Sequence, residues 1–326
     1  MKLLVILSAI LALCATSVIP KDNSQYVEGE SRYVWISNDE GRQVLVDLHE
    51  PVTRSDRSGA NNQYWLFTRA NPNNRQLLVN GNAASVTGSN YSGQRPTVVI
   101  VHGWVGNGNH QVNTLVRAAF LHVQDCNVIT LDWSGVAGQN YVNAVSGVPN
   151  VGQHLGNFLS FLVNTAGGNW NNFHLIGFSL GAHVIASAGR AAAGNPGRVT
   201  GLDPAGPLWI GNSNRLTNNA GQYVEGIHTD GGLQGIFNPV GHADFYPNGG
   251  RNTQPGCSNS ECSHAFAVQL FASSVYTNHF VGRLCANTAQ AENGQCTGAT
   301  FNMGNGNFAK RGSGIYGLTT QSNWPF

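Results

Sequence analysis

The segment Gly177-Phe178-Ser179-Leu180-Gly181 places a serine between two glycines in the pattern Gly-x-Ser-x-Gly. The apolar run 173–176 leads directly into it, and an alanine-rich stretch with helical character follows it. A serine on so sharp a strand-to-helix turn has a strained backbone, and glycines on either flank remove side chains that would clash. The pattern predicts that Ser179 is a nucleophile for acyl transfer. A turn that carries an incidental serine is the alternative.

A nucleophilic serine needs N–H groups that stabilise the oxyanion of its tetrahedral intermediate. The first expected donor is the amide of Leu180, the residue after the nucleophile. The second is expected in the loop after the apolar run 97–101, where His102-Gly103-Trp104 follows, and we assign it to the amide of Trp104. His102 is an alternative base, but we expect it to pack and hydrogen-bond beneath this loop.

The catalytic acid is expected after Ser179, at the end of a later strand, because this type of site follows the chain order serine, acid, histidine. Asp203 meets that requirement: the run 199–202 leads into it, and the prolines that follow stop the strand and hold the loop. Asp230 and Asp244 are the competing carboxylates.

Four histidines follow Asp203 and are candidates for the base: His228, His242, His264 and His279. His228 and His242 sit in segments that favour a structural role. His264 lies two positions after Cys262 and just before the apolar run 265–275, so a disulfide-pinned loop that leads into a helix would hold it. The residues alone favour His264 but leave the choice open.

Short apolar runs alternate with helical patterns from Tyr64 onward. The run 97–101 is continuous and β-branched, which is typical of a strand buried on both faces. The alternation predicts an α/β fold with a mostly parallel sheet flanked by helices. Strands are expected at 64–69, 77–79, 97–101, 127–132, 173–177 and 198–202, and helices at 112–123, 151–164 and 180–193.

Residues 1–17 have the pattern of a secretory signal peptide, with Lys2, the apolar run 3–13 and small residues up to Ser17. A membrane anchor is the alternative, but the run is too short, since a spanning helix needs about 20 apolar residues. The signal predicts a secreted, extracellular protein. Residues 18–60 are polar and irregular apart from a strand pattern at 44–46, and are expected to be a pro-segment or an N-terminal extension. Residues 61–326 are expected to form the α/β domain.

The chain has a net charge of +1 and only 10% charged residues, so nothing indicates a nucleic-acid partner. In an oxidising compartment its cysteines predict two local disulfides, although spacing does not fix connectivity. A metal site built from cysteines is a weaker alternative, because no Cys-x-x-Cys pair is present. The sequon at Asn90-Tyr91-Ser92 predicts glycosylation. The expected pairs are Cys257–Cys262 and Cys285–Cys296, with Cys126 unpaired.

Taken together, these segments resemble the pancreatic-lipase family of secreted lipases, and most closely its insect and venom phospholipase A1 branch. The resemblance runs in family order from about residue 60 to 322. It implies an α/β-hydrolase fold with Ser179 as nucleophile, Asp203 as acid and His264 as base. The segments that carry it are 101–104 (Val-His-Gly-Trp), 127–133 (Asn-Val-Ile-Thr-Leu-Asp-Trp), 177–183 (Gly-Phe-Ser-Leu-Gly-Ala-His), 201–207 (Gly-Leu-Asp-Pro-Ala-Gly-Pro), 227–230, 240–250 and 262–264.

Departures from the family pattern bear on the substrate. In the family, the disulfide that corresponds to Cys257–Cys262 closes a lid, which is long in triglyceride lipases, but here only residues 258–261 lie between the cysteines. The facing loop, 231–239, is also short. The resemblance therefore implies an open site that admits a bulky polar headgroup, as in phospholipase A1 members.

Further departures bear on cofactors and partners. The chain ends at Phe326, which leaves no room for the family's C-terminal β-sandwich, so neither that domain nor a colipase partner is expected. The family's calcium loop uses carboxylates where Asn212, Thr217 and Ala220 stand here, and calcium prefers several charged oxygen ligands. We therefore expect no metal and no cofactor. Phe178 replaces a histidine often found in the family, without consequence for the catalytic residues.

The leading hypothesis is a secreted phospholipase A1 that cleaves the sn-1 acyl ester of phospholipids at a membrane or micelle surface. A neutral lipid (triglyceride) lipase or a galactolipid lipase is the alternative within the same class of enzyme. A non-catalytic lipid-binding protein, as in insect yolk proteins of similar fold, is the alternative outside it. Those proteins have a disrupted serine or triad, whereas all three positions are intact here, which favours the enzyme.

Overall fold

The structure is a computed structural model that describes residues 19–38, 42–53 and 58–326. The expected signal peptide, residues 1–17, lies outside the described residues. Among those that are described, no helix is both long and apolar enough to cross a lipid bilayer.

One large sheet of eleven strands runs through the protein, in the order β12-β11-β13-β10-β9-β8-β7-β5-β6-β3-β4. The strands from β13 to β6 in this order pair in parallel, and the strands at both edges pair antiparallel. The strands are β3 (Gln63–Phe67), β4 (Gln76–Leu78), β5 (Thr97–Val101), β6 (Asn127–Asp132), β7 (Phe173–Phe178), β8 (Arg198–Leu202), β9 (Val224–Ile227), β10 (Ala243–Pro247), β11 (Val281–Cys285), β12 (Thr300–Asn302) and β13 (Gly314–Leu318).

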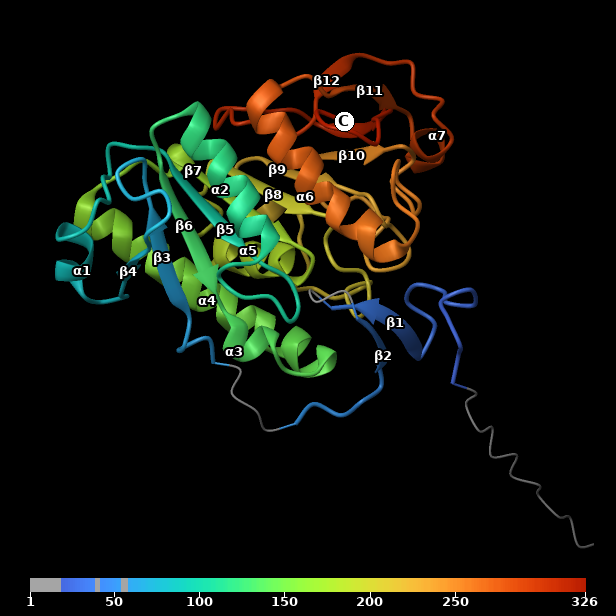
Figure 1. Ribbon diagram of the computed structural model, residues 1–326, viewed down its shortest axis with the longest axis horizontal. Coiled ribbons are helices and arrows are strands. Elements are labelled where there is room, and N and C mark those ends of the chain that lie inside the picture. Colours follow the sequence, from blue (N-terminus) through green and yellow to red (C-terminus); the bar gives the residue numbers. More distant parts are fainter. Residues whose placement is uncertain (1–18, 39–41, 54–57) are drawn as a thin grey trace, which may run out of the picture.

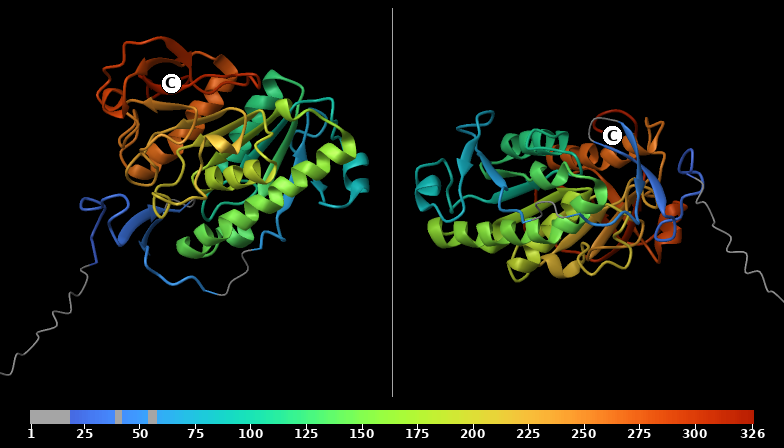
Figure 2. Two further views of the ribbon diagram at one scale, coloured as in Figure 1. Left: turned by 180° about the vertical axis from the view of Figure 1, so that it is seen from behind. Right: turned by 90° about the horizontal axis from the view of Figure 1, so that it is seen from below.

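Helices cover both faces of this sheet. On one face α2 packs against α6, and on the other α4 packs against α5, so that two separate apolar cores form (Figure 1; Figure 2, left). This confirms the predicted α/β fold with a mostly parallel sheet. The helices are α1 (Ala83–Thr87), α2 (Gln111–Val123), α3 (Ser134–Ala137), α4 (Tyr141–Ala166), α5 (Leu180–Ala191), α6 (Ser260–Thr277) and α7 (Thr288–Glu292), with short 3-10 turns at Trp170–Asn172 and Asn218–Ala220.

The register of the central strands brings their carboxyl ends to one edge of the sheet. Val101 of β5 lies opposite Gly177 of β7, and Gly177 lies opposite Gly201 of β8. The loops that follow these strands therefore start side by side, which is where α/β sheets place their binding sites.

The helix expected at 151–164 begins ten residues earlier than the sequence indicated, because α4 starts at Tyr141. The side chain of Asn140 caps it by accepting a hydrogen bond from the Asn143 amide. Pro149 lies inside this helix, where proline costs about 3 kcal/mol because it removes a hydrogen bond. Val148 and Val151 beside it are fully buried in the apolar core that α4 shares with α5, and their burial offsets that cost.

The N-terminal segment contains a two-stranded antiparallel hairpin of β1 (Tyr33–Ser37) and β2 (Gln43–Asp47). The strand expected at 44–46 is confirmed as β2, and β1 was not predicted. Val34, Ile36 and Val46 are buried in the same apolar core as α4 and α5. Strand β1 also contacts α6, so the hairpin lies beside the edge of the sheet where the central strands end (Figure 1).

Candidate active site

Ser179 lies at the turn between β7 and α5, with φ 54° and ψ −122°. Positive φ is unusual for a residue other than glycine and is a mark of strain at functional sites. The flanking glycines are required by close backbone approaches. A Cβ on Gly177 would lie 2.2 Å from the Gly181 carbonyl oxygen, and one on Gly181 would lie 2.4 Å from the Val101 carbonyl oxygen. The Gly-x-Ser-x-Gly pattern is therefore a steric requirement of this turn.

Backbone hydrogen bonds tie this turn to the loop that carries Asp203. The Ser179 amide donates to the Leu202 carbonyl at 3.1 Å, and the Ala205 amide donates to the Ser179 carbonyl at 3.2 Å. The turn at Ser179 and the loop after β8 thus form one backbone unit, which fixes the carboxylate of Asp203 relative to the serine.

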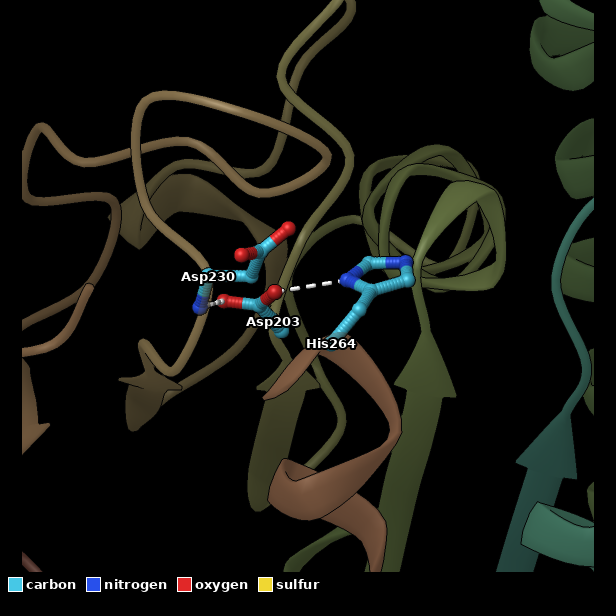
Figure 3. Close-up of side chains that lie close together, drawn as sticks. All are labelled: Asp203, Asp230 and His264. Carbon is cyan, nitrogen blue, oxygen red and sulfur yellow. Dashed lines mark hydrogen bonds and ion pairs between the residues drawn. The ribbon is translucent and has the colours of Figure 1, made fainter. Parts of the chain in front are cut away.

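Asp203 and His264 form a buried hydrogen-bonded pair. The Nδ1 of His264 lies 2.6 Å from Oδ2 of Asp203, as Figure 3 shows, a distance typical of a strong bond to a charged acceptor. The other carboxylate oxygen, Oδ1, accepts from the amides of Thr229 at 2.7 Å and Asp230 at 3.1 Å. Asp203 is fully buried, so these donors take the place of water and hold the carboxylate in one orientation.

His264 lies in the second turn of α6, on the helix that the Cys257–Cys262 disulfide anchors. The Asn259 side chain caps this helix by accepting from the Cys262 amide at 2.9 Å. The imidazole packs against the ring of Phe178, with ring centroids 4.6 Å apart. The disulfide and the cap hold the start of the helix, while Phe178 and Asp203 hold the ring itself.

Ser179 and His264 line the same cavity, which has a volume of about 90 Å³. Each side chain is almost closed off from solvent, with 8% of Ser179 and 7% of His264 exposed. The structure therefore brings together all three residues that the sequence predicts as the triad: the acid holds one nitrogen of the imidazole, and the ring shares a cavity with the serine.

The two amides predicted for the oxyanion hole also lie next to the serine. Leu180 is the first residue of α5, so its N–H has no partner within the helix. Gly103 brings the Trp104 loop to the serine, since a Cβ on Gly103 would lie 3.0 Å from Cβ of Ser179. Among the described residues, neither the Leu180 nor the Trp104 amide donates to another backbone group. Both are available to an oxyanion.

His102 supports this loop and is not placed to act as a base. Its Nδ1 lies 2.9 Å from the Gly103 carbonyl, and its Nε2 accepts from the Trp133 amide at 3.2 Å. Its own carbonyl accepts from the Trp133 indole at 2.9 Å. With both ring nitrogens engaged in a fully buried site, His102 holds the loop in position.

The other histidines after Asp203 have structural partners. His228 lies between the Ile236 carbonyl at 2.7 Å and the Asp244 carboxylate at 3.0 Å. His242 accepts from the Val224 amide at 3.0 Å. None of the three histidines other than His264 lines the cavity at Ser179, and His279 is exposed.

Asp230, one of the two carboxylates that competed with Asp203 in the sequence, lies beside the Asp203–His264 pair. Its Oδ2 accepts from the Ser260 hydroxyl at 2.5 Å and from the Gln234 amide at 3.1 Å, while its Oδ1 has no partner among the described residues. Burial, assisted by the charge of Asp203, raises the pKa of Asp230 from 3.8 to about 7. At neutral pH the carboxyl is therefore partly protonated.

Asp203, Asp230 and His264 are also the only group in the described part of the chain with three ligand atoms close enough for a metal ion, within 4.8 Å of one another (Figure 3). The 2.6 Å contact between His264 Nδ1 and Asp203 Oδ2 is that of a hydrogen bond. Such a bond occupies the ring nitrogen that a metal would need. The geometry fits an acid–base pair better than a metal centre.

Both predicted disulfides are present, Cys257–Cys262 and Cys285–Cys296, and Cys126 is free and buried. The sequon residue Asn90 is half-buried, and its side-chain amide donates to Asn71 at 2.9 Å. Glycosylation would replace one of the two hydrogens on this amide nitrogen, and it remains a prediction.

A serine on a strand-to-helix turn of a mostly parallel sheet, with an acid from the loop after β8 and a histidine from α6, defines a protein of the α/β-hydrolase class. The chain belongs to the Lipase family, whose family model matches residues 31–326.

Curated relatives agree with this assignment. Pancreatic triacylglycerol lipase of Myocastor coypus is 37% identical over 211 residues, which cover 62% of this chain and 46% of that protein. Lipase member H-A of Xenopus laevis is 36% identical over 266 residues, which cover 77% of this chain and 56% of that protein. The chain thus spans about half the length of the curated relatives it matches. The solved structure of esterase PE8 matches 44% of this chain and 70% of its own at 18% identity and a TM-score of 0.32, which adds nothing to the assignment.

Proposed function

We propose that this protein is a serine carboxylic-ester hydrolase that acts on lipid esters. The observation that carries the proposal is the pairing of Asp203 with His264 at 2.6 Å, in a site where His264 and Ser179 line one cavity. Membership of the Lipase family supports the same chemistry. In this proposal Ser179 is the nucleophile, His264 the general base and Asp203 the residue that orients the imidazole.

The mechanism follows from these positions. His264 removes the hydroxyl proton as Ser179 attacks the ester carbonyl, and Asp203 stabilises the imidazolium that forms. The amides of Leu180 and Trp104 bind the oxyanion, and each such donor contributes about a hundred- to a thousand-fold in rate. The imidazolium then protonates the leaving alkoxide. Water, deprotonated by the same imidazole, hydrolyses the acyl-enzyme and regenerates the serine.

For the substrate we propose a phospholipid, cleaved at its sn-1 ester at a membrane or micelle surface. The support is the short Cys257–Cys262 loop, in which the two cysteines are five positions apart and Glu261 faces the cavity. A loop this short covers little of the cavity that holds Ser179, which favours a substrate with a bulky polar headgroup. Triglyceride is the second candidate, because a triacylglycerol lipase is among the relatives.

We further propose that the protein is secreted and that it needs neither a metal nor colipase. Two disulfides support the first of these points, because disulfides persist in oxidising compartments. N-terminal sequencing of the protein recovered from culture medium would locate the mature start, and chelator treatment would test the independence from metal.

An active-site serine phosphonate tests the enzyme proposal. The purified protein should be labelled stoichiometrically, and Ser179→Ala should keep the fold, as judged by circular dichroism, while losing the label. A folded wild-type protein that is not labelled would instead be a lipid-binding member without catalysis. Fatty-acid release from phosphatidylcholine vesicles, with different acyl chains at the two glycerol positions, should then be compared with release from emulsified triglyceride. Strong preference for triglyceride would overturn the phospholipid assignment.

A further inference from the structure

The N-terminal hairpin forms part of the candidate active site. Ile36, Ser37 and Asn38, at the end of β1, line the same cavity as Ser179 and His264. Along β1 the burial alternates, so that Val34 and Ile36 both face the protein interior, with 0% and 5% exposed. Only Ile36 of this pair reaches the cavity.

The lining of this cavity contains both apolar and polar side chains. The apolar part includes Ile36, Trp104, Tyr141 and Ala205; the polar part includes Gln111, Gln234 and Glu261. The polar atoms of the two aromatic rings are already engaged. The Trp104 indole N–H donates to the Gln139 carbonyl at 2.8 Å, and the Tyr141 hydroxyl donates to the Pro207 carbonyl at 2.9 Å.

The Trp104 and Tyr141 rings therefore present apolar carbon atoms to the cavity. They pack edge to face at a centroid distance of 5.3 Å. Ile36 contributes a branched alkyl side chain to the same apolar part. A surface made of two aromatic rings and an aliphatic side chain, next to a nucleophilic serine, suits an alkyl chain and offers nothing to a charged headgroup.

Hydrogen bonds fix the position of β1 at this point. The Ser37 amide donates to Oε1 of Gln234 at 3.0 Å, and Nε2 of Gln234 donates to the Ser260 hydroxyl at 3.0 Å. Ser260 in turn donates to Asp230. Gln234 is 3% exposed, so its hydrogen bonds to Ser37 and Ser260 are shielded from water. They hold Ile36 as a rigid wall of the cavity.

We propose that Ile36 of the β1–β2 hairpin is a specificity-determining residue that forms the wall of the acyl-chain subsite and limits the length of acyl chain that the site accepts. This inference deepens the proposed function and rests on it. It also implies that the hairpin belongs to the working enzyme, so that removing residues 18–60 would open the subsite.

The size of the effect follows from the area that each methylene buries. A buried methylene contributes about 0.8 kcal/mol, which corresponds to roughly a fourfold change in kcat/KM. Ile36→Ala removes three carbons from the wall. We therefore expect the preferred acyl chain to lengthen by about two methylenes, with kcat/KM for the longer ester rising roughly fifteenfold relative to the shorter one. Ile36→Phe should move the preference toward shorter chains.

The assay is kcat/KM for a series of p-nitrophenyl esters from butanoyl to palmitoyl, since one leaving group isolates the acyl subsite. Val34→Ala is the matched control: it lies two residues away on the same face of β1, is fully buried and does not line the cavity. It should lower stability and leave the chain-length profile unchanged. If Ile36→Ala does not fold, Ile36→Val gives the same test with a smaller shift.

Opposite shifts for Ile36→Ala and Ile36→Phe, with an unchanged profile for Val34→Ala, support the proposal. Identical profiles in the wild type and both Ile36 variants overturn it while the enzyme stays active. A shift in Val34→Ala equal to that in Ile36→Ala also overturns it, because loosening of the core would then be the cause. A wild type that neither hydrolyses any ester nor reacts with the phosphonate removes the proposed function itself, and the subsite with it.

Discussion

Substituting Asp203 by asparagine separates the roles of the two neighbouring carboxyls in the site. In the structure, Oδ1 of Asp203 accepts from the amides of Thr229 and Asp230, and Oδ2 faces His264. The asparagine oxygen can replace Oδ1 and keep both amide bonds, so the fold should persist. The asparagine NH₂ group then stands where Oδ2 stood, 2.6 Å from Nδ1 of the imidazole.

That geometry imposes the unproductive tautomer on the imidazole. An NH₂ group only donates, so Nδ1 must accept, and the ring proton moves to Nε2. A protonated Nε2 cannot take the proton of Ser179. The same change in a serine protease lowers kcat by about 10⁴, which is close to 5.5 kcal/mol of transition-state stabilisation at 1.36 kcal/mol per tenfold. We expect a loss of that size in kcat/KM for Asp203→Asn.

Asp230→Asn is the matched control, because Asp230 lies beside the pair but does not bond the imidazole. Its Oδ2 accepts from Ser260 and Gln234, and an asparagine oxygen can replace it in both bonds. Since its pKa is raised to about 7, the carboxyl already carries a proton part of the time at neutral pH. We expect kcat/KM to change by about tenfold or less.

Both variants should be measured with one soluble p-nitrophenyl ester, together with the rate of phosphonate labelling and the free energy of unfolding in urea. The labelling rate should fall with kcat/KM in Asp203→Asn, because both report the nucleophilicity of Ser179. The reasoning is refuted if Asp203→Asn stays within about tenfold of the wild type and Asp230→Asn loses about 10⁴, since Asp230 would then be the acid.

Three further predictions concern stability. Burial raises the pKa of Glu28 from 4.5 to about 7, so the unfolded chain loses this proton at lower pH than the folded protein. The free energy of unfolding should therefore fall as pH rises between these two values. Glu28→Gln should abolish that decline in urea titrations. Glu225 bonds to both Arg198 and Lys310 at 2.5 Å in the buried interior, so Glu225→Gln should cost about 3–5 kcal/mol in chemical denaturation, with kcat retained by the folded fraction. Replacing both cysteines of the Cys257–Cys262 disulfide by alanine should cost about 2 kcal/mol from loop entropy, measured the same way, and a cost near zero would show that the loop is ordered without it.

The sequence predicted those parts of the site that depend on local sterics. The glycines around Ser179 and the β-branched run of β5 leave few alternative conformations, so the turn and the strands before it were recognisable. Asp203 and Asp230 were harder to separate, because they follow neighbouring strands, β8 and β9, that are paired in register. Only the three-dimensional position of the His264 imidazole distinguishes them.

The sequence failed where a distant contact overrides a local signal. Pro149 is a helix breaker by propensity, yet α4 continues through it because the helix is buried in the apolar core that it shares with α5. Strand β1 was missed although Tyr33 to Ile36 are aromatic and β-branched residues of the kind that strands favour, but its contact with the cavity depends on Gln234, far along the chain. Neither the continuation of α4 past Pro149 nor this cavity contact has a signature in its own neighbourhood.

Gln234 connects two parts of the site that serve different purposes. Its backbone amide donates to Asp230, and its carbonyl accepts from Gly206, in the loop that follows the acid. Its side chain holds Ser37 in the wall of the cavity. The Asp203 carboxylate is therefore held by backbone amides that tolerate little change, whereas the end of β1 at the cavity is held to this loop by the side chain of Gln234. Because the attachment is at the backbone of Ser37, the side chain of Ile36 can vary without disturbing Asp203. This arrangement lets substrate preference diverge while the acid–base geometry is preserved.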